Sequence, residues 1–421
     1  MSNVIYKKAV KGGSITLPPS KSVAHRAMIC AALAQGNCTV FNIDSSNDML
    51  ATMNFIKAMG KDFNYDPKTK VLKISSGTTS QITSVDCIES GSTLRFIIPI
   101  MAALGINTTF TGSGRLPKRP IGVYTEILKG VNTKGVGLPF CINGQLQSGE
   151  FKLRGDISSQ FITGLLFALP LLKGDSKIIL TTELQSESYV DITLDVMKSF
   201  GVTATRTDYG YKVKGNQTYK TVNYTVEGDW SQAAFFIAMG AFSKNPIKLK
   251  GLKLDSKQGD KKCTEVFGNM NIKVNFADDE LIINKGELKA ITVNVGDIPD
   301  MVPALACVMA LANGTSEITN AKRLRIKESD RLSAISNALN SLGANVTELE
   351  DGLIIKGTNK LIGGFVDGCN DHRIVMAMAC LRENCLNNIE VTDSHSINKS
   401  YPDFYKDYIK LGGELNGIDM G

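Results

Sequence analysis

The chain repeats one order of polar and apolar positions. A short polar cluster precedes an apolar run of helical length, then a small residue, and then a run typical of a strand. Successive clusters begin about 70 residues apart, which indicates an internal repeat. The clusters are Ser20–Ser22, Ser90–Thr93, Ser158–Gln160, Asp229–Gln232, Asp297–Asp300 and Asn370–Arg373.

A second element follows in most of the repeats. It is an amphipathic helix that ends in Gly, and two strands with a turn between them come next. Residues 54–75, 195–215 and 337–357 are examples. The repeat unit is therefore β-α-β-α-β-β, and about six such units fill the chain. This order predicts an α/β fold.

Six units, in a chain too long for one ordinary core, suggest two domains of three units each. We expect an N-terminal domain over residues 15–227 and a C-terminal domain made of residues 1–14 and 228–421. The junction falls near Val226–Asp229, where a strand ends and Gly and Asp precede the fourth capped helix. We also expect the first residues to complete the last sheet of the second domain.

Composition narrows the class of protein. The chain has 421 residues, of which 43% are hydrophobic and 21% are charged, as in a soluble globular protein. A net charge of +6 suits a small anionic substrate and does not require nucleic acid. The N-terminus lacks a signal-peptide core, and the apolar run Phe161–Leu172 is too short to span a bilayer. We therefore expect a cytoplasmic protein that binds neither membrane nor nucleic acid.

The helix starts carry positive charge that capping does not explain. In Leu17–Arg26, Ser20 can cap a helix, but Lys21 and Arg26 oppose the helix dipole unless an anion lies beside them. A helix N-terminus with added Lys and Arg suits phosphate or carboxylate. If the units pack about pseudo-threefold axes, these starts converge at one end of each domain, and two facing ends form a positive cleft. The alternative is that each cluster caps its own helix and the cations are solvated.

Charged residues near these starts and in short polar loops are the chemical candidates. Asp300 lies at a helix start, where N-capping also explains it, and a cap carboxylate can serve as a base. On a helix, Glu328 and Arg331 share a face, although a stretch such as Arg323–Leu332 is usually solvated. Of the histidines, His372 is the best candidate. The basic candidates are Lys21, Arg26, Arg95, Arg119, Lys327, Arg331, Arg373 and Lys399.

Several cofactor motifs are absent from the sequence. It contains no G-x-G-x-x-G after a strand, no G-x-x-x-x-G-K-[ST] loop and no G-x-S-x-G elbow. The nine cysteines form no C-x-x-C pairs, and no His/Cys cluster has metal spacing. Many cations with few carboxylates indicate group transfer between polyanionic small molecules by positioning, charge neutralisation and proton transfer. We expect neither a metal nor an organic cofactor.

These residues, in this order, resemble the EPSP synthase family, the 3-phosphoshikimate 1-carboxyvinyltransferases. The resemblance implies two domains hinged around a cleft, each an inverse α/β barrel of three βαβαββ repeats with its helices inside. It also implies transfer of the enolpyruvyl group of phosphoenolpyruvate to the 5-hydroxyl of shikimate 3-phosphate through a tetrahedral intermediate. This is a step of the shikimate pathway to chorismate and the aromatic amino acids. The matching motifs span nearly the whole chain and are LPPSKSVAHRA, GSTLRF, LPKRPI, SSQF, IPDM, RIKESDRL, DHR and NKSYPDF.

The resemblance also implies roles residue by residue, for a monomer. Asp300 takes the proton from the attacking hydroxyl, and Glu328 delivers a proton to the methylene carbon and shares that role with Lys21. The residues implied to hold shikimate 3-phosphate are Lys21, Ser22, Arg26, Ser158, Ser159, Gln160, Ser186, Tyr189, Asp300 and Lys327. The residues implied to meet phosphoenolpyruvate are Lys21, Gly91, Arg119, Gln160, Arg331, His372, Arg373 and Lys399, with His372 near the phosphate.

Three places depart from the common family pattern. Glu89–Ser92 reads ESGS where members commonly have NAGT, so Glu89 alters the local anion contact and bears on binding of the inhibitor glyphosate. His25 and Arg323 stand where many members have Asn. None of these departures removes a proposed catalytic group.

Three alternatives stay open on the sequence alone. The sister enolpyruvyl transferase that acts on UDP-N-acetylglucosamine shares the fold and the chemistry. It has Lys-Asn where this chain has Lys21–Ser22, and it usually has a loop Cys in the stretch that corresponds to Gly112–Gly122, which contains none here. An RNA 3′-phosphate cyclase-like protein is built on related units, but it needs a basic stripe or a nucleotidylated His, and neither is evident. A non-catalytic phosphate-binding module would not need Asp300 and Glu328 together.

Overall fold

The computed structural model describes residues 3–77 and 83–418. The chain divides into two compact units, an N-terminal unit of Pro19–Glu227 and a C-terminal unit that joins Met1–Pro18 to Gly228–Gly421. The chain therefore passes from the C-terminal unit into the N-terminal unit after residue 18, whereas the sequence predicted this boundary after residue 14. The reason is that β2 (Gly13–Thr16) pairs in parallel with β15 (Ile247–Lys250) and holds the chain in the C-terminal unit up to that point.

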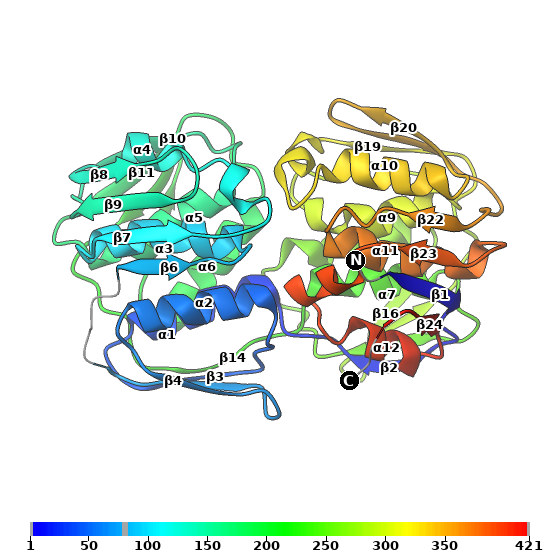
Figure 1. The fold of residues 1–421 in the computed structure, drawn as a ribbon, viewed down its shortest axis with the longest axis horizontal. Helices are drawn as coiled ribbons and strands as arrows, with labels where there is room; N and C mark the ends of the chain where they lie inside the picture. The colour runs from blue at the N-terminus through cyan, green and yellow to red at the C-terminus, as the bar shows by residue number, and fades with distance from the viewer. Residues whose placement is uncertain (1–2, 78–82, 419–421) are drawn as a thin grey trace. The chain divides into compact units, whose positions relative to one another are not determined.

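The described part of the N-terminal unit contains three four-stranded sheets (Figure 1). Each has one parallel pair and two antiparallel pairs. In spatial order the strands are β14 (Asn223–Thr225), β3 (Cys38–Phe41), β5 (Val71–Ile74) and β4 (Phe63–Asp66); β6 (Ser84–Asp86), β7 (Thr108–Thr111), β9 (Phe140–Gly144) and β8 (Val131–Lys134); and β10 (Glu150–Leu153), β11 (Ser176–Leu180), β13 (Gly210–Val213) and β12 (Ala204–Thr207).

The described part of the C-terminal unit contains three sheets of the same pattern. One of them takes its third strand from the start of the chain, because β1 pairs antiparallel with both β23 and β24. In spatial order the strands are β16 (Lys273–Ala277), β17 (Glu280–Asn284), β15 and β2; β18 (Thr292–Asn294), β19 (Thr315–Thr319), β21 (Gly352–Lys356) and β20 (Asn345–Leu349); and β22 (Gly364–Val366), β23 (Ile389–Val391), β1 (Val4–Lys8) and β24 (Glu414–Asn416).

The helices that follow the polar clusters form the core of each unit. Every residue of α7, α9 and α11 is buried, and these helices pack on one another, with strands around them in Figure 1. A helix that is apolar on all sides belongs in a core rather than at a surface. The core helices are α1 (Lys21–Leu33), α3 (Gly91–Ala103) and α5 (Ser159–Ala168) in the N-terminal unit, and α7 (Trp230–Gly240), α9 (Val302–Met309) and α11 (His372–Leu381) in the C-terminal unit.

The second helix of each repeat packs beside this core. In Figure 1, α1 and α2 lie over one face of the sheet that contains β3, β4 and β14. These second helices are α2 (Asn47–Ala58), α4 (Val123–Ile127), α6 (Glu187–Ser199), α8 (Cys263–Asn269), α10 (Arg331–Ser341) and α12 (Phe404–Lys410). Short 3₁₀ turns complete the units and are η1 (Leu116–Lys118), η2 (Leu169–Leu171), η3 (Gly259–Lys262), η4 (Pro299–Met301), η5 (Lys322–Ile326), η6 (Arg382–Asn384) and η7 (Ser394–Lys399).

Two helix starts differ from the sequence prediction. Asp300 lies in η4, one turn before α9, and α9 has no side-chain cap, so the capping explanation of Asp300 is wrong. The stretch Arg323–Leu332 is not one helix, because η5 ends at Ile326 and α10 begins only at Arg331. Charged side chains of both stretches contact other repeats, since Arg331 donates to Asp300 and to Asp371.

Candidate functional site

Lys21, in the first turn of α1, contacts a carboxylate of its own unit. Its Nζ donates to Oδ2 of Asp48 at 2.8 Å, and the two side chains are only 16% and 12% exposed. Asp48 therefore offsets the unfavourable position of a cation at a helix N-terminus. Asp48 was not among the predicted site residues, because an acid in the first turn of a helix such as α2 already has an ordinary explanation in the helix dipole.

Arg26 joins α1 to α6. Its Nε donates to Oγ1 of Thr193 at 2.8 Å, one terminal nitrogen donates to the carbonyl of Tyr189 at 2.8 Å, and the other donates to the carbonyl of Ser22 at 2.6 Å. The guanidinium also lies over the ring of Phe96, 5.1 Å from its centroid. Burial lowers the pKa of Arg26 to about 9, so the group is still charged at neutral pH. Arg26 thus holds the first turn of α6, which contains Tyr189, against α1.

Gln160 is held between two core helices. Its Oε1 accepts a hydrogen bond from Arg95 at 2.6 Å, and its Nε2 donates to Oγ of Ser92 at 2.9 Å. Arg95 also donates to the carbonyl of Pro120 at 3.0 Å, so it connects α3, α5 and the loop that follows Arg119. Arg95 was a basic candidate without an assigned role, and the structure gives it this bridging position.

Gly91, the first residue of α3, lies directly against Arg119. A Cβ at position 91 would come within 2.4 Å of a guanidinium nitrogen of Arg119 and within 2.6 Å of its carbon. Only glycine permits so close an approach. The carboxylate of Glu89 lies against Gly114 in the same way, where a Cβ would come within 2.5 Å of it. The acidic departure from the family pattern therefore contacts the loop that leads to Arg119.

The predicted hydroxyl residues of this unit lie at helix starts. Oγ of Ser158 accepts from the backbone N–H of Gln160 at 3.3 Å and caps α5. Ser159 is buried in the first turn of α5, and Ser186 is buried immediately before α6, with a left-handed φ of 55°. Backbone N–H groups and hydroxyls at helix N-termini suit the binding of phosphate oxygens.

In the C-terminal unit, Arg331 joins three carboxylates. Its Nε donates to Asp371 at 2.8 Å, one terminal nitrogen donates to Asp300 at 2.9 Å, and the other donates to Glu328 at 2.6 Å. Burial acts to lower the pKa of Arg331, but Asp371, Glu328 and Asp300 outweigh it and raise that pKa above its ordinary value. The arginine therefore sets the positions of both acidic candidates at once.

Asp300 also contacts other cations. Arg373 donates to its backbone carbonyl at 2.8 Å and to its Oδ2 at 3.2 Å, and Lys327 donates to its Oδ1 at 3.3 Å. Burial lowers the pKa of Lys327, and the charge of Asp300 acts against that shift. Three cations around one carboxylate favour its ionised, proton-accepting form.

His372 begins α11, and Lys399, the last residue of η7, reaches the loop directly before that helix. The Nδ1 of His372 is 3.7 Å from Oδ1 of Asp371, the residue that caps the helix by accepting from the N–H of Arg373. Nζ of Lys399 donates to the carbonyl of Asn370 at 2.7 Å. Burial acts to raise the pKa of Asp371, but Arg331 and then His372 outweigh it and hold that pKa below its usual value. Asp371 was not predicted as a site residue, although its place directly before the helix marks it as a cap.

The predicted residues therefore form two clusters, one in each unit. In the C-terminal unit, the contacts described above join these residues directly or through Asn370 and Asp371. In the N-terminal unit, they join Arg26 to Ser22 and Tyr189 and place Arg119 against Gly91. The N-terminal cluster is Lys21, Ser22, Arg26, Gly91, Arg119, Ser158, Ser159, Gln160, Ser186 and Tyr189. The C-terminal cluster is Asp300, Lys327, Glu328, Arg331, His372, Arg373 and Lys399.

Two other kinds of feature do not occur among the described residues. Within residues 3–77 and 83–418, no group of three or more His, Cys, Asp or Glu side chains is arranged to hold a metal ion. None of the helices in this part of the chain combines the length and the apolar character needed to cross a bilayer.

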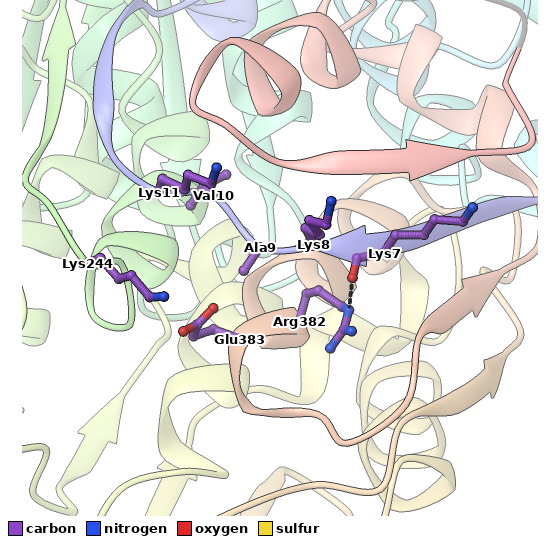
Figure 2. Close-up of a pocket in the computed structure, with 8 residues that line it drawn as sticks. All are labelled: Lys7, Lys8, Ala9, Val10, Lys11, Lys244, Arg382 and Glu383. Atoms are coloured by element: carbon purple, nitrogen blue, oxygen red, sulfur yellow. Dashed lines mark hydrogen bonds between the residues drawn. The ribbon is translucent and has the colours of Figure 1, made fainter.

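Positive charge also gathers at a different place in the C-terminal unit (Figure 2). Arg382 donates to the carbonyl of Lys7 there at 2.8 Å, and Lys8 pairs with Glu414. None of the pocket's residues is a predicted site residue, and its acid, Glu383, is exposed. The pocket has a volume of about 260 Å³ and is lined by Lys7, Lys8, Ala9, Val10, Lys11, Lys244, Arg382 and Glu383.

Solved structures show which fold this chain has. An EPSP synthase from Acinetobacter baumannii superposes with a TM-score of 0.82 at 24% identity and covers 99% of this chain and 100% of that chain. The enolpyruvyl transferase NikO from Streptomyces tendae superposes with a TM-score of 0.80 at 15% identity. The match covers 99% of this chain and 98% of that chain. At these identities the likeness establishes the fold, which is that of the enolpyruvyl transferases.

The sequence comparisons identify the family within this class. The family model described as EPSP synthase (3-phosphoshikimate 1-carboxyvinyltransferase) matches residues 6–408. A 3-phosphoshikimate 1-carboxyvinyltransferase from Clostridium kluyveri is 45% identical over 414 residues, which are 97% of each chain. One from Clostridium perfringens is 45% identical over 424 residues, 99% of this chain and all of the relative. The chain belongs to the EPSP synthase family, which confirms the family, the α/β fold class and the transferase activity predicted from the sequence.

Proposed function

We propose that this chain transfers the enolpyruvyl group of phosphoenolpyruvate to the 5-hydroxyl of shikimate 3-phosphate, with the two clusters above as its substrate-binding and catalytic residues. One observation supports the residue assignment most directly. Arg331 holds Asp300 and Glu328 on adjacent nitrogens, so a proton acceptor and a proton donor lie within reach of one guanidinium. A pair of carboxyl groups placed among cations is what an addition of an alcohol to an anionic alkene requires.

The cations account for substrate binding. Each substrate carries a carboxylate and a phosphate, so binding both needs several Arg and Lys side chains. We assign the hydroxyl-rich N-terminal cluster chiefly to shikimate 3-phosphate, with Asp300 and Lys327 added from the C-terminal cluster. We assign phosphoenolpyruvate to Arg331, His372, Arg373 and Lys399, with Lys21, Gly91, Arg119 and Gln160 added from the N-terminal cluster.

Proton transfer is assigned to three residues. Asp300 takes the proton of the 5-hydroxyl as its oxygen bonds to C2 of phosphoenolpyruvate, and Glu328 protonates the methylene carbon, so that a tetrahedral intermediate forms. In the second half, the methyl group returns a proton to Glu328, the C–O bond to phosphate breaks, and the leaving phosphate takes the proton held by Asp300. Lys21 shares the transfer at carbon with Glu328. These steps balance without a metal or an organic cofactor, and we propose a monomer in the cytoplasm that binds no nucleic acid.

The test is phosphate release from phosphoenolpyruvate with one of two acceptors. Release with shikimate 3-phosphate, and the absence of release with UDP-N-acetylglucosamine, is the expected result. Turnover only with UDP-N-acetylglucosamine assigns the chain to the sister reaction. Turnover with neither acceptor overturns the proposed activity, provided that the phosphoenolpyruvate is recovered unchanged.

A further inference from the structure

Asp260 is a buried acid to which the proposed mechanism gives no role. It lies in η3 and is 4% exposed. Oγ of Ser231 donates to its Oδ2, whereas its Oδ1 is buried and has no hydrogen-bond partner among the described residues. Burial of a carboxylate oxygen without a partner is unfavourable, so this position calls for a physical explanation.

Asp260 and the candidate base Asp300 lie on two turns, η3 and η4, that pack against the same core helix, α7. The charges of Asp300 and Arg373 both act on the pKa of Asp260. Arg373 donates to Asp300 through both of its terminal nitrogens. The guanidinium of Arg373 therefore interacts electrostatically with both Asp260 and Asp300, and it donates a hydrogen bond to the carboxylate of Asp300.

The other groups around Asp260 determine when it ionises. Burial raises the pKa of Asp260 to about 7, and the charges of Asp300 and Asp229 act in the same direction. The hydrogen bond from Ser231 and the charge of Arg373 act in the opposite direction. The remaining neighbours add little charge, because burial raises the pKa of the Cys263 thiol on α8, and Lys262 of η3 contacts Asp297 at 3.4 Å.

The surroundings of Asp300 present a chemical difficulty that Asp260 answers. Lys327, Arg331 and Arg373 keep Asp300 ionised, but cations this close also make a carboxylate a weak base. We propose that Asp260 is a positioning residue for Asp300: the ionised carboxylate of Asp260 acts electrostatically on Arg373 and keeps Asp300 a stronger proton acceptor than its three cations alone would permit. This inference rests on the proposed role of Asp300 as the base.

The experiment compares pH profiles of kcat for the wild type, Asp260→Asn and Ser231→Ala. Wild-type kcat should rise with pH through about 7, as Asp260 ionises. Asp260→Asn retains the size of the side chain and an oxygen for Ser231, yet it should lose this rise and about tenfold in kcat above pH 7, with KM nearly unchanged. Ser231→Ala removes a hydrogen bond to the carboxylate and should move the rise to higher pH. Glu265→Gln, an exposed acid on α8, is the matched control and should keep the wild-type profile.

A second measurement separates failure of the inference from failure of the proposed function. In a carboxyl-carbon NMR titration without substrate, Asp260→Asn should lower the pKa of Asp300 by about one unit. An unchanged Asp300 titration overturns the inference, as does a wild-type pH profile in Asp260→Asn. A loss of kcat that accompanies a loss of thermal stability at every pH assigns Asp260 a structural role instead. If the wild type does not turn over its two substrates, the proposed function fails, and the NMR titration still decides the inference.

Discussion

The Nε of Arg331 lies 2.8 Å from Oδ2 of Asp371, and the side chains of this pair are only 1% and 0% exposed. Asp371 caps α11, whereas Arg331 begins α10, so the contact ties two helix starts together. Because the arginine is fixed by this buried partner, its two terminal nitrogens point in set directions toward Asp300 and Glu328. The pair thus positions both of the proposed proton-transfer groups.

The first prediction concerns this pair. Asp371→Asn removes the partner charge from a buried arginine, which should lower the free energy of unfolding by about 3 kcal/mol. Urea denaturation followed by circular dichroism measures the change. The control is Glu350→Gln, which breaks the exposed pair with Lys322 and should cost less than about 1 kcal/mol. Equal losses in the two variants would contradict the structural importance of Asp371.

The second prediction concerns Lys21. Lys21→Met should reduce kcat by about 10³-fold or more, because the proposed site loses a cation placed to contact both substrates and to share a proton transfer. The fold should be retained, but the melting temperature should fall, because the substitution takes this cation away from Asp48, whose side chain is only 12% exposed. Lys244→Met, in the separate basic pocket, removes the same charge and should leave kcat unaltered. A similar loss in both variants would point to general electrostatics.

The third prediction concerns the acidic pair. Asp300→Ala and Glu328→Gln should each lower kcat by about 10²- to 10⁴-fold and change substrate affinity much less, because each group acts on a proton in the transition state. Steady-state kinetics combined with calorimetric binding of shikimate 3-phosphate separates the two effects. Near-native turnover in either variant would refute the proton-transfer role of that residue.

The fourth prediction concerns Gly91. In Gly91→Ala, the new Cβ would lie 2.4 Å from the Arg119 guanidinium, so that side chain must move. The KM for phosphoenolpyruvate should rise by about tenfold or more, since a displaced arginine loses its hydrogen bonds to a carboxylate or phosphate. A Cβ at Gly268 on α8 would have no atom within 4 Å, so Gly268→Ala should leave KM unchanged. Unchanged KM in both variants would remove Gly91 and Arg119 from the proposed site.

The fifth prediction concerns stability and pH. His25 is 1% exposed, its Nδ1 shares a hydrogen bond of 2.7 Å with Thr52, and burial lowers its pKa from 6.5 to about 3. Between these pH values the unfolded chain binds a proton that the folded chain does not, so His25 makes stability fall as pH falls through that window. Ionisation of His25 in the unfolded chain should therefore lower the free energy of unfolding by about 2 kcal/mol at pH 5 relative to pH 7.

Urea denaturation at pH 7 and pH 5 checks this sign and magnitude. His25→Asn should lose about 2 kcal/mol less than the wild type between the two pH values, whatever its stability at pH 7. Identical pH dependence in the wild type and His25→Asn would show that His25 is not buried in its neutral form.

Local sequence was sufficient to predict much of the fold. Ser20, Ser90 and Ser158 each precede an apolar run, and each accepts the capping hydrogen bond that its position predicts. Capping and hydrophobic periodicity involve residues within a turn or two of one another, so they can be read without knowledge of the packing. The site assignments stay predictions, although the structure gathers them into two clusters.

Prediction was poorer wherever the partner of a side chain lies far along the chain. Asp300 has the local pattern of a helix cap, yet its partners are Arg331 and Arg373, which come from later repeats. Asp48 and Asp260 were missed for the same reason, because an acid in the first turn of a helix or in a 3₁₀ turn is usually a solvated residue. Nothing in their neighbouring residues marks them as buried.

By itself, the sequence determined the repeat, the helices and strands within it, and the motifs of the family, because each depends on interactions between near neighbours. Only the tertiary structure decided which carboxylate each cation binds. The contact of Arg331 with Asp371 spans 40 residues, and that of Lys21 with Asp48 spans 27. Such contacts depend on how the repeats pack, and burial then decides which charges must be paired.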